Sequence, residues 1–200
     1  MIGAVILAAG KSERMGESKL LQEIGGKKVI ELVIDPFRGV ADEIIVVLGH
    51  APEKLVDFIR RLGVKHVVNP DYEMGMTSSF KRGLQEAKPC EAAFLVLGDQ
   101  PCVERDFLVK MVDVWISTKA KIVSPIYKGK KGHPVLFDRS LFDEILLLPE
   151  ECTIRDVMHR HAKDIFLLEA GEWSIMDMDT SDDFERMKRY ILERAGGKLG

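Results

Sequence analysis

The chain has 200 residues, with 29 Lys and Arg against 32 Asp and Glu, which gives a formal net charge of -3. An apolar fraction of 46% and a charged fraction of 30% are typical of a globular protein and exclude a chain that is disordered throughout. This charge provides no broad basic surface, so nucleic acid is excluded as the expected partner. A phosphorylated ligand should instead be small and bound by local basic residues.

The N-terminal apolar run predicts a cytoplasmic protein with no membrane association. It extends from Ile2 to Ala9, lacks a basic flank and is broken at Gly10, so it is too short for a signal peptide or a membrane span. The three cysteines are odd in number and contain no C-x-x-C pair. We therefore expect neither a disulfide framework nor a structural zinc site.

Short runs rich in Val, Ile and Leu alternate with stretches of helical period over the first two thirds of the chain. Strands are predicted at residues 4–7, 43–48, 65–68, 92–97 and 121–127. Apolar residues recur at helical spacing from Leu55 to Leu62 and, less regularly, from Phe107 to Trp115. No linker interrupts the pattern, which predicts one α/β domain over residues 1–200. Its expected architecture is a mostly parallel central sheet with helices on both faces, as in Rossmann-like proteins.

The last third departs from this simple alternation. We predict strands at residues 133–137, 165–168 and 173–176, and helices at residues 138–147 and 153–161. A final helix is predicted over residues 181–194, because Thr180 and Asp183 have the spacing of a capping box and Phe184, Met187 and Ile191 form an apolar stripe.

The first strand ends in small residues that lead into a basic loop. Leu7, Ala8, Ala9 and Gly10 allow backbone N–H groups to approach a phosphate chain closely, and Lys11, Arg14 and Lys19 supply positive charge. The loop lacks the glycines of G-x-G-x-x-G. It also fails the Walker pattern, because five residues separate Gly10 from Gly16 and Glu17 follows. The absence of both patterns disfavours an NAD dehydrogenase and a P-loop kinase. The loop could instead bind a triphosphate, and the alternative is an ordinary solvated turn.

Two later segments also carry candidate binding residues. Asn69 precedes a loop that ends in Ser78 and Ser79, at the expected N-terminus of a helix, where N–H groups bind anions or base edges. The basic turn from Lys128 to His133 leads into a strand and could meet an acceptor phosphate. For each segment, an ordinary helix cap or hairpin is the alternative.

Carboxylates follow two of the predicted strands. Asp99 comes directly after the most apolar run of the chain, at the end of a predicted strand. It should face the same crevice as the segment from Leu7 to Gly10, which we call the glycine loop. It is the candidate ligand for a cation, and its alternative role is to cap a turn. Asp177 and Asp179 lie on one side of the predicted strand 173–176 if its alternation continues, so one of them could be a second ligand. Alternatively, both only favour the N-terminus of the next helix.

Four of these segments, in this order, resemble the molybdenum cofactor cytidylyltransferase family, within the larger group of MobA-like nucleotidyltransferases. They are Leu7 to Gly16 with Lys19, then Asn69-Pro70 with Gly75 to Ser79, then Gly98-Asp99-Gln100-Pro101, and then Gly132-His133-Pro134. The resemblance extends from Ile2 to about Phe184. It implies the nucleotidyltransferase variant of the Rossmann-like fold and transfer of a nucleotidyl group from an NTP to a phosphorylated acceptor.

The resemblance also implies residue roles. Leu7 to Gly10 would bind the base and ribose, Arg14 and Lys19 the triphosphate and Asp99 a magnesium ion, with Asp179 in the second metal position. Asn69, Ser78, Ser79 and His133 would face the nucleotide or a pterin acceptor. With Lys19, Arg14 and Asp99 in the catalytic group, catalysis would depend on position and electrostatics, without a protein nucleophile.

Base and acceptor are finer implications of the resemblance. Members with alanine in the third place of the L-A-x-G loop tend to use CTP and guanylyl-transferring members tend to have glycine there, so Ala9 favours CTP over GTP. The segment from Glu150 to Asp156 departs from the family's G-D-x-G-A-R pattern, with only Arg155 retained, which leaves the acceptor open. A phosphorylated pterin is expected, with a molybdoenzyme as a further partner. The alternatives are a sugar- or alditol-phosphate nucleotidyltransferase, or a protein that binds nucleotide and delivers cofactor without catalysis.

Overall fold

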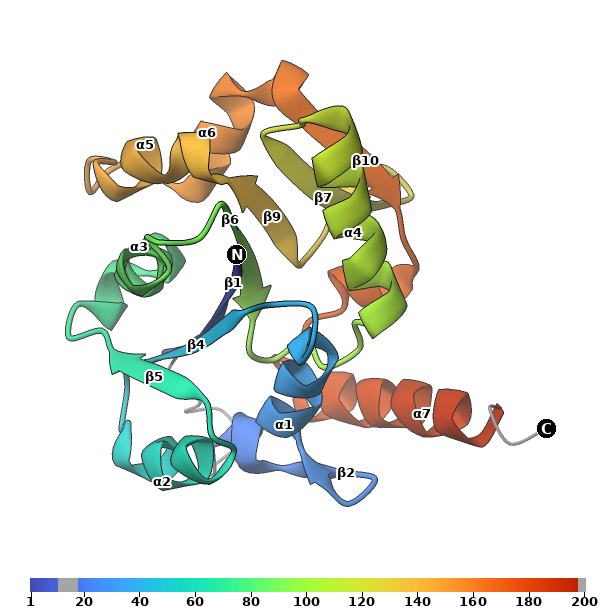
Figure 1. The fold of residues 1–200 in the computed structure, drawn as a ribbon. Helices are drawn as coiled ribbons and strands as arrows, with labels where there is room; N and C mark the ends of the chain where they lie inside the picture. Colours follow the sequence, from blue (N-terminus) through green and yellow to red (C-terminus); the bar gives the residue numbers. More distant parts are fainter. Residues whose placement is uncertain (11–17, 198–200) are drawn as a thin grey trace.

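A twisted, mostly parallel sheet forms the centre of the computed structural model, which describes residues 1–10 and 18–197. Its strands follow the order β10-β7-β9-β6-β1-β4-β5, and β8 pairs with β7 outside this path (Figure 1). The bounds are β1 Ile2–Ala8, β4 Glu43–Leu48, β5 Lys65–Val68, β6 Ala92–Leu97, β7 Ile122–Tyr127, β8 Lys130–Lys131, β9 Val135–Asp138 and β10 Ile165–Glu169. A separate hairpin joins β2 (Glu23–Ile24) to β3 (Lys27–Lys28).

The parallel register places the ends of the central strands at one edge. β1 pairs with β4 and β6, and β4 with β5, all in parallel, with Leu7 opposite Leu97 and Val47. The residues that follow β1, β5 and β6 therefore emerge together, as the sequence predicted. β9 runs antiparallel between β6 and β7, so the sheet is mixed on that side.

Helices cover both faces of the sheet (Figure 1). α3, α5 and α6 lie on one face, and α1, α2, α4 and α7 on the other. Their bounds are α1 Val29–Ile34, α2 Glu53–Arg61, α3 Met76–Glu86, α4 Arg105–Thr118, α5 Phe142–Leu146, α6 Ile154–Arg160 and α7 Ser181–Gly197. Within the described parts of the chain, none of the helices has the length and apolarity required to cross a bilayer.

Alternation along β1 divides the core into two halves. Ala4 and Ile6 pack with the cluster under α1, α2, α4 and α7, whereas Val5 packs with the cluster under α3, α5 and α6. All three side chains are fully buried, which explains why β1 has an uninterrupted apolar sequence. Each buried Val or Ile stabilises the fold by about 1.5–3 kcal/mol, so the strand that carries the glycine loop is firmly anchored.

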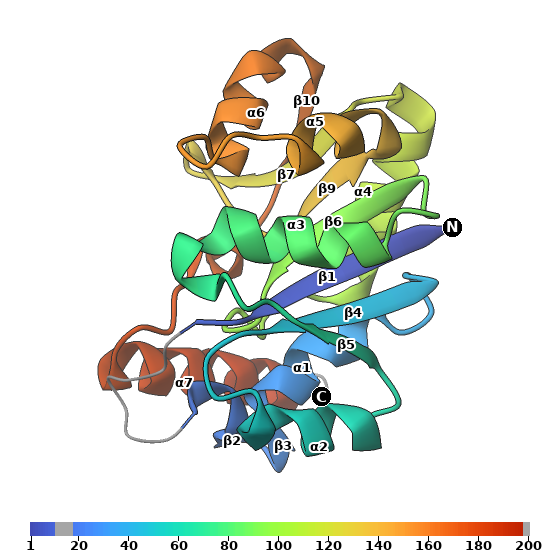
Figure 2. The ribbon, with the colours of Figure 1, turned by 90° about the vertical axis from the view of Figure 1, so that its left-hand side faces the viewer.

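α3 runs along the sheet in direct contact with β1, β4 and β5 (Figure 2). Gly83 makes this approach possible, because a Cβ atom at this position would lie 2.2 Å from Val5 Cγ1 and 2.7 Å from Val47 Cγ2. The close packing fixes the position of α3, whose N-terminus faces the edge where the strands end.

The last third contains one incorrect prediction. The expected strand at residues 173–176 is a 3-10 helix, Glu172–Ile175. Trp173 packs edge-on against Phe107 of α4 with 4.9 Å between ring centroids, and the carbonyl of Ser174 accepts a hydrogen bond from the N–H of His133. The apolar side chains of this segment are thus buried by a turn, and Asp177 and Asp179 do not follow a strand whose alternation would place them on one side.

Other elements of this region agree with the sequence to within a few residues. The strand predicted from residue 133 begins at Val135, directly after the cis peptide bond between His133 and Pro134. The capping box of α7 is confirmed, with the Thr180 N–H donating to Asp183 Oδ2 at 3.0 Å and the Asp183 N–H to Thr180 Oγ1 at 3.1 Å.

Candidate functional site

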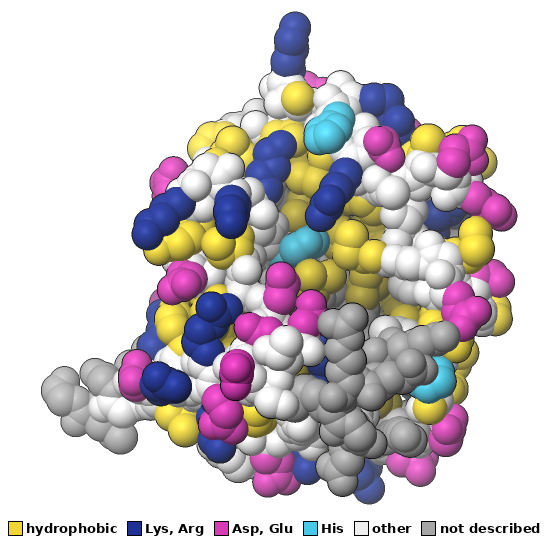
Figure 3. All heavy atoms as spheres, turned by 180° about the vertical axis from the view of Figure 1, so that it is seen from behind, with side chains coloured by type: hydrophobic (Ala, Val, Ile, Leu, Met, Phe, Trp, Pro, Cys, Tyr) yellow, Lys and Arg dark blue, Asp and Glu magenta, His cyan; other side chains and the backbone are white. Residues whose placement is uncertain are grey.

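A cavity of about 360 Å³ lies at the edge where β1, β5 and β6 end. Its walls include eight residues predicted from the sequence, namely Leu7, Ala8, Ala9, Gly10, Lys19, Ser79, Asp99 and Asp179. The volume is within the range of small-molecule sites. Figure 3 views the molecule from this side, where Lys and Arg side chains lie above a hollow with an apolar floor and Asp and Glu side chains lie below it.

Two glycines allow neighbouring strand ends to close around the glycine loop. A Cβ atom on Gly98 would lie 2.6 Å from the carbonyl oxygen of Leu7, and one on Gly49 would lie 2.6 Å from that of Ala9. The Gly98 N–H donates to the Leu7 carbonyl at 2.9 Å. Because Gly98 contacts the β1 backbone directly, the following residue, Asp99, is held beside the loop.

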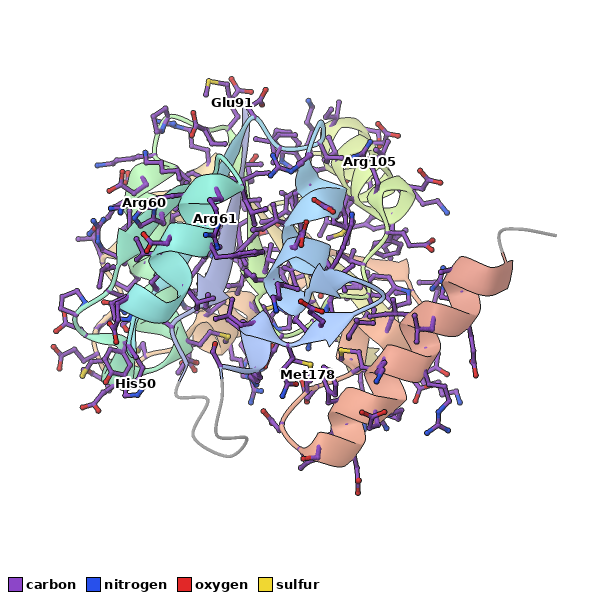
Figure 4. The ribbon with its side chains drawn as sticks, turned by 90° about the horizontal axis from the view of Figure 1, so that it is seen from below. His50, Arg60, Arg61, Glu91, Arg105 and Met178 are labelled. Carbon is purple, nitrogen blue, oxygen red and sulfur yellow. The ribbon has the colours of Figure 1, made fainter. Side chains whose placement is uncertain are left out.

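Lys19 lies between the two predicted metal ligands. Its Nζ is 2.6 Å from Asp99 Oδ2, 3.4 Å from Asp179 Oδ1 and 3.1 Å from the backbone carbonyl of Met178. Burial alone would lower the pKa of Lys19, but attraction to Asp99 and Asp179 outweighs it and raises the pKa above 10.5. Lys19 is therefore a permanent cation inside an acidic cluster. Met178 itself is fully buried just before α7 (Figure 4).

The two acids that the sequence could not rank have different partners. Asp179 faces Lys19 in the cavity, whereas Asp177 Oδ1 accepts a hydrogen bond from Gln100 Nε2 at 3.1 Å. Asp177 thus joins the turn after β6 to the segment before α7, outside the cavity lining. The geometry favours Asp179 as the partner of Asp99.

Asn69 organises the loop between β5 and α3. Its side-chain Nδ2 donates to Ser78 Oγ at 2.9 Å and to Ser79 Oγ at 3.1 Å, and its Oδ1 accepts from the N–H of Asp71 at 3.1 Å. Because both amide hydrogens are used inside the protein and Asn69 is 3% exposed, its main contribution is to hold the start of α3. Only Ser79 of this triad lines the cavity.

Gly75 precedes α3 with φ +93° and ψ -170°, a conformation that is nearly restricted to glycine. In the first hydrogen bond of the helix, the Ser79 N–H donates to the Gly75 carbonyl. The N–H groups of Met76, Thr77 and Ser78 precede this bond and therefore have no acceptor within the helix. Gly75 and Met76 line the cavity. The N-terminus of α3 therefore presents backbone donors to any anion or base bound there.

A second cavity of about 760 Å³ adjoins the first, and Gly75 and Met76 line both. Asn69 and Ser78 lie in its wall, together with Lys81, Arg82 and Arg155. Lys81 Nζ donates to the carbonyl of Leu148 at 2.8 Å, which joins α3 to the segment after α5. The predicted residues Asn69 and Ser78 are thus adjacent to the first cavity and outside its lining.

His133 occupies a different place from that of the other predicted residues. It lines a small cavity of about 10 Å³ with Gln100 and Trp173, and burial, partly opposed by a hydrogen bond with the Leu95 backbone, lowers its pKa. Its Nδ1 and the Oε1 of Gln100 are buried without a hydrogen-bond partner in the described structure. Arg14 and Lys11 lie outside the described residues, and Lys130 and Lys131 are exposed on β8.

Several residues of the site were absent from the sequence predictions, among them Met178, Gly49 and Tyr72. The Met178 carbonyl could not be found, because a backbone oxygen leaves no residue-type signal. Gly49 approaches Ala9 because the two residues directly follow β4 and β1, which pair with each other. Tyr72 lines the cavity and lies 3.3 Å from His50 through its hydroxyl, and an aromatic residue in the segment after Asn69 was a usable signal.

We expect thiol labelling to distinguish Cys152 from the other two cysteines. Cys152 is half-buried on the wall of the larger cavity, whereas burial raises the pKa of Cys102 to about 12 and also raises that of Cys90. Since the thiolate is the nucleophile, a disulfide reagent at pH 8 should label one thiol rapidly in the native protein and all three after denaturation. Cys152→Ser should abolish the rapid phase, and a rapid phase that survives would contradict this assignment.

Comparison with known proteins gives consistent results. Residues 4–165 match the family model of the MobA-like NTP transferase domain. The chain is 27% identical to the molybdenum cofactor cytidylyltransferase of Escherichia coli (strain K12) over 96% of this chain and 98% of that protein. It is 25% identical to a probable molybdenum cofactor guanylyltransferase of Natranaerobius thermophilus, over 95% of this chain and 96% of the relative.

Solved structures show the same fold. Rv0371c from Mycobacterium tuberculosis H37Rv superposes with a TM-score of 0.82 at 30% identity, over 94% of this chain and 97% of that one. A complex of Rv0371c with manganese superposes with a TM-score of 0.77 at 28% identity, over 94% of this chain and 98% of that one. The Rossmann-like architecture expected from the sequence is confirmed.

Proposed function

The chain belongs to the MobA-like NTP transferases and is thus a nucleotidyltransferase, and on this premise we propose that it transfers CMP from CTP to the molybdenum cofactor. The observation that carries the proposal is the convergence of the loop from Leu7 to Gly10, Lys19 and Asp99 on one cavity of nucleotide size. The full-length similarity to a cytidylyltransferase supports the choice of acceptor.

The donor set of the cluster fits a divalent metal. Asp99, Asp179 and the Met178 carbonyl offer hard oxygen atoms around one point, as Mg²⁺ and Mn²⁺ prefer. We assign Asp99 and Asp179 as the residues that would hold magnesium. When bound, the metal would neutralise charge on the phosphates and orient them.

The chain's own residues would act by position and charge. The N–H groups of the glycine loop and of the α3 N-terminus would bind the nucleotide, and Lys19 would pair with its phosphates. A phosphate oxygen of the acceptor attacks the α-phosphorus in line, and the bond from that phosphorus to the bridging oxygen breaks. Pyrophosphate leaves with the electron pair, so no protein nucleophile is needed.

Pyrophosphate release tests this proposal directly. The purified protein would be incubated with magnesium, each of the four NTPs in turn, and the reduced molybdenum cofactor. Release that depends on both CTP and the cofactor is the expected result. Release with a sugar or alditol phosphate in place of the cofactor would select that acceptor class. NTP binding without release for any acceptor would overturn the catalytic proposal.

Ala9 is the residue that we expect to control base choice. It is 5% exposed and belongs to the lining of the cavity, so the size of the residue at this position should affect the space left for a larger purine base. Ala9→Gly should raise the ratio of kcat/KM for GTP to that for CTP by about tenfold, within the range for one methyl group in a binding pocket. The measurement is pyrophosphate release at varied CTP and GTP. An unchanged ratio in a folded variant would contradict the assignment.

A further inference from the structure

The ammonium group of Lys19 lies at the point where a metal ion would meet its ligands. Its three nearest oxygens are Asp99 Oδ2, Met178 O and Asp179 Oδ1, at 2.6, 3.1 and 3.4 Å. They are the two carboxylates and the carbonyl that suit a hard cation. The Lys19 side chain is only 19% exposed, so its charged end is held within the cluster and is not extended into solvent.

Within the described residues, Lys19 is the only side-chain cation that pairs with these carboxylates. Neither Asp99 nor Asp179 has a second Lys, Arg or His nitrogen of the described chain within 4.0 Å. The two acids approach from distant parts of the chain, the turn after β6 and the segment before α7. Without a cation between them their like charges would repel, so the single positive charge of Lys19 offsets part of this repulsion.

We propose that Lys19 is a placeholder cation, so that a divalent metal enters the Asp99–Asp179 site only when Lys19 leaves it. A metal needs oxygen ligands at about 2.0–2.1 Å for Mg²⁺, in a nearly octahedral arrangement. The ammonium already occupies the space between these oxygens, and it would strongly repel a metal ion bound to the same oxygens. The two cations therefore exclude each other.

A nucleotide provides the alternative partner for Lys19. Its phosphates are anions that can accept the hydrogen bonds of the ammonium group, which frees Asp99 and Asp179 for the metal. The metal is then taken up together with the nucleotide and not before it. This binding order rests on the proposed function, because it assumes an NTP as the ligand of the cavity.

Binding of Mn²⁺ in the absence of nucleotide tests the placeholder without any catalytic assay. Mn²⁺ would be titrated into the purified full chain and the free ion measured by electron paramagnetic resonance. Lys19→Met keeps much of the apolar stem and removes the charge, and it should bind one Mn²⁺ at least tenfold more tightly than the parent. The double variant Lys19→Met, Asp179→Asn should lose this gain, which would locate the ion at the proposed site.

Lys27→Met is the matched control. Lys27 Nζ pairs with Asp35 Oδ2 at 2.6 Å on the surface, so this variant also removes one lysine charge from a carboxylate partner and should leave Mn²⁺ affinity unchanged. Lys19→Gln provides a second variant if Lys19→Met does not fold. In the parent protein, a non-hydrolysable CTP analogue should increase Mn²⁺ affinity by a similar factor.

Equal Mn²⁺ affinity in the parent and in both folded Lys19 variants would overturn the placeholder role. A gain that persists in the double variant would also overturn it, because the ion would then lie elsewhere. Neither result depends on the pyrophosphate assay. A protein that gains Mn²⁺ affinity in the Lys19 variants but never releases pyrophosphate would retain the placeholder and refute the transferase proposal.

Discussion

Asp99→Asn is expected to lower kcat for pyrophosphate release by about three orders of magnitude in a protein that remains folded. Asparagine preserves the shape of the side chain and one acceptor for Lys19 Nζ, but it removes the charge that would hold the metal and balance Lys19. Loss of one electrostatic stabiliser of a transition state costs about 10²–10³ in rate, and loss of a metal ligand adds to this. Stopped assays at saturating CTP and acceptor would measure the effect.

The neighbouring acids provide controls for this experiment. Asp179→Asn should also reduce kcat strongly, because Asp179 faces the same cavity. Asp177→Asn should change it by less than about threefold, since Asp177 is engaged by Gln100 and an amide can still accept that hydrogen bond. Near-normal turnover of folded Asp99→Asn would refute the role of Asp99, and the reverse order for residues 177 and 179 would exchange their roles.

Gly83→Ala is expected to destabilise the protein by about 3 kcal/mol. The added methyl group would overlap the fully buried Val5 at 2.2 Å, in the interior where α3 contacts β1 and β4. Overpacking of a rigid core costs about 1–3 kcal/mol and occasionally more, and the β-branched neighbours Val5 and Val47 have little freedom to move. Urea unfolding monitored by circular dichroism would measure the change.

A second substitution and a control sharpen this prediction. The double variant Gly83→Ala, Val5→Ala should be more stable than the sum of the two single changes predicts, because removal of the Val5 methyl groups relieves the overlap. Gly196→Ala in α7 meets no atom within 4 Å and should be neutral or slightly stabilising. Additive losses in the double variant would show that α3 does not depend on this close approach.

The sequence predicted those parts of the fold that depend on local pattern. The runs at Glu43–Leu48, Lys65–Val68 and Ala92–Leu97 form strands with these bounds, because parallel strands buried on both faces have continuous apolar sequences. The position of β9 between β6 and β7 was not predicted, since strand order depends on distant contacts. The apolar pattern around Trp173 predicts a strand, but the segment forms a 3-10 helix in which Trp173 packs against Phe107 of α4. The local pattern cannot distinguish this kind of burial from that of a strand.

For the site, the sequence was informative where a residue type carries the chemistry. Asp99 and the glycine loop could be placed together because the ends of parallel strands meet at one edge. The choice between Asp177 and Asp179 could not be made, since it depends on a turn whose geometry the tertiary contacts determine. The partners of Asn69 and the separate cavity of His133 were equally inaccessible, because both depend on side-chain orientations in the folded protein.

The Lys19 cluster joins residues 159 and 160 positions apart in the chain. During translation, β1 and Lys19 emerge first and Asp179 emerges near the end, so a ribosome at about 5–20 residues per second separates them by roughly 10 to 30 s. A nascent chain therefore exposes its glycine loop long before the residues proposed to hold the metal are complete. If the proposed site is correct, synthesis itself delays its completion until the C-terminal segment has docked. A chain cleaved before Met178 would lack the Met178 carbonyl and Asp179 and should be unable to transfer a nucleotidyl group.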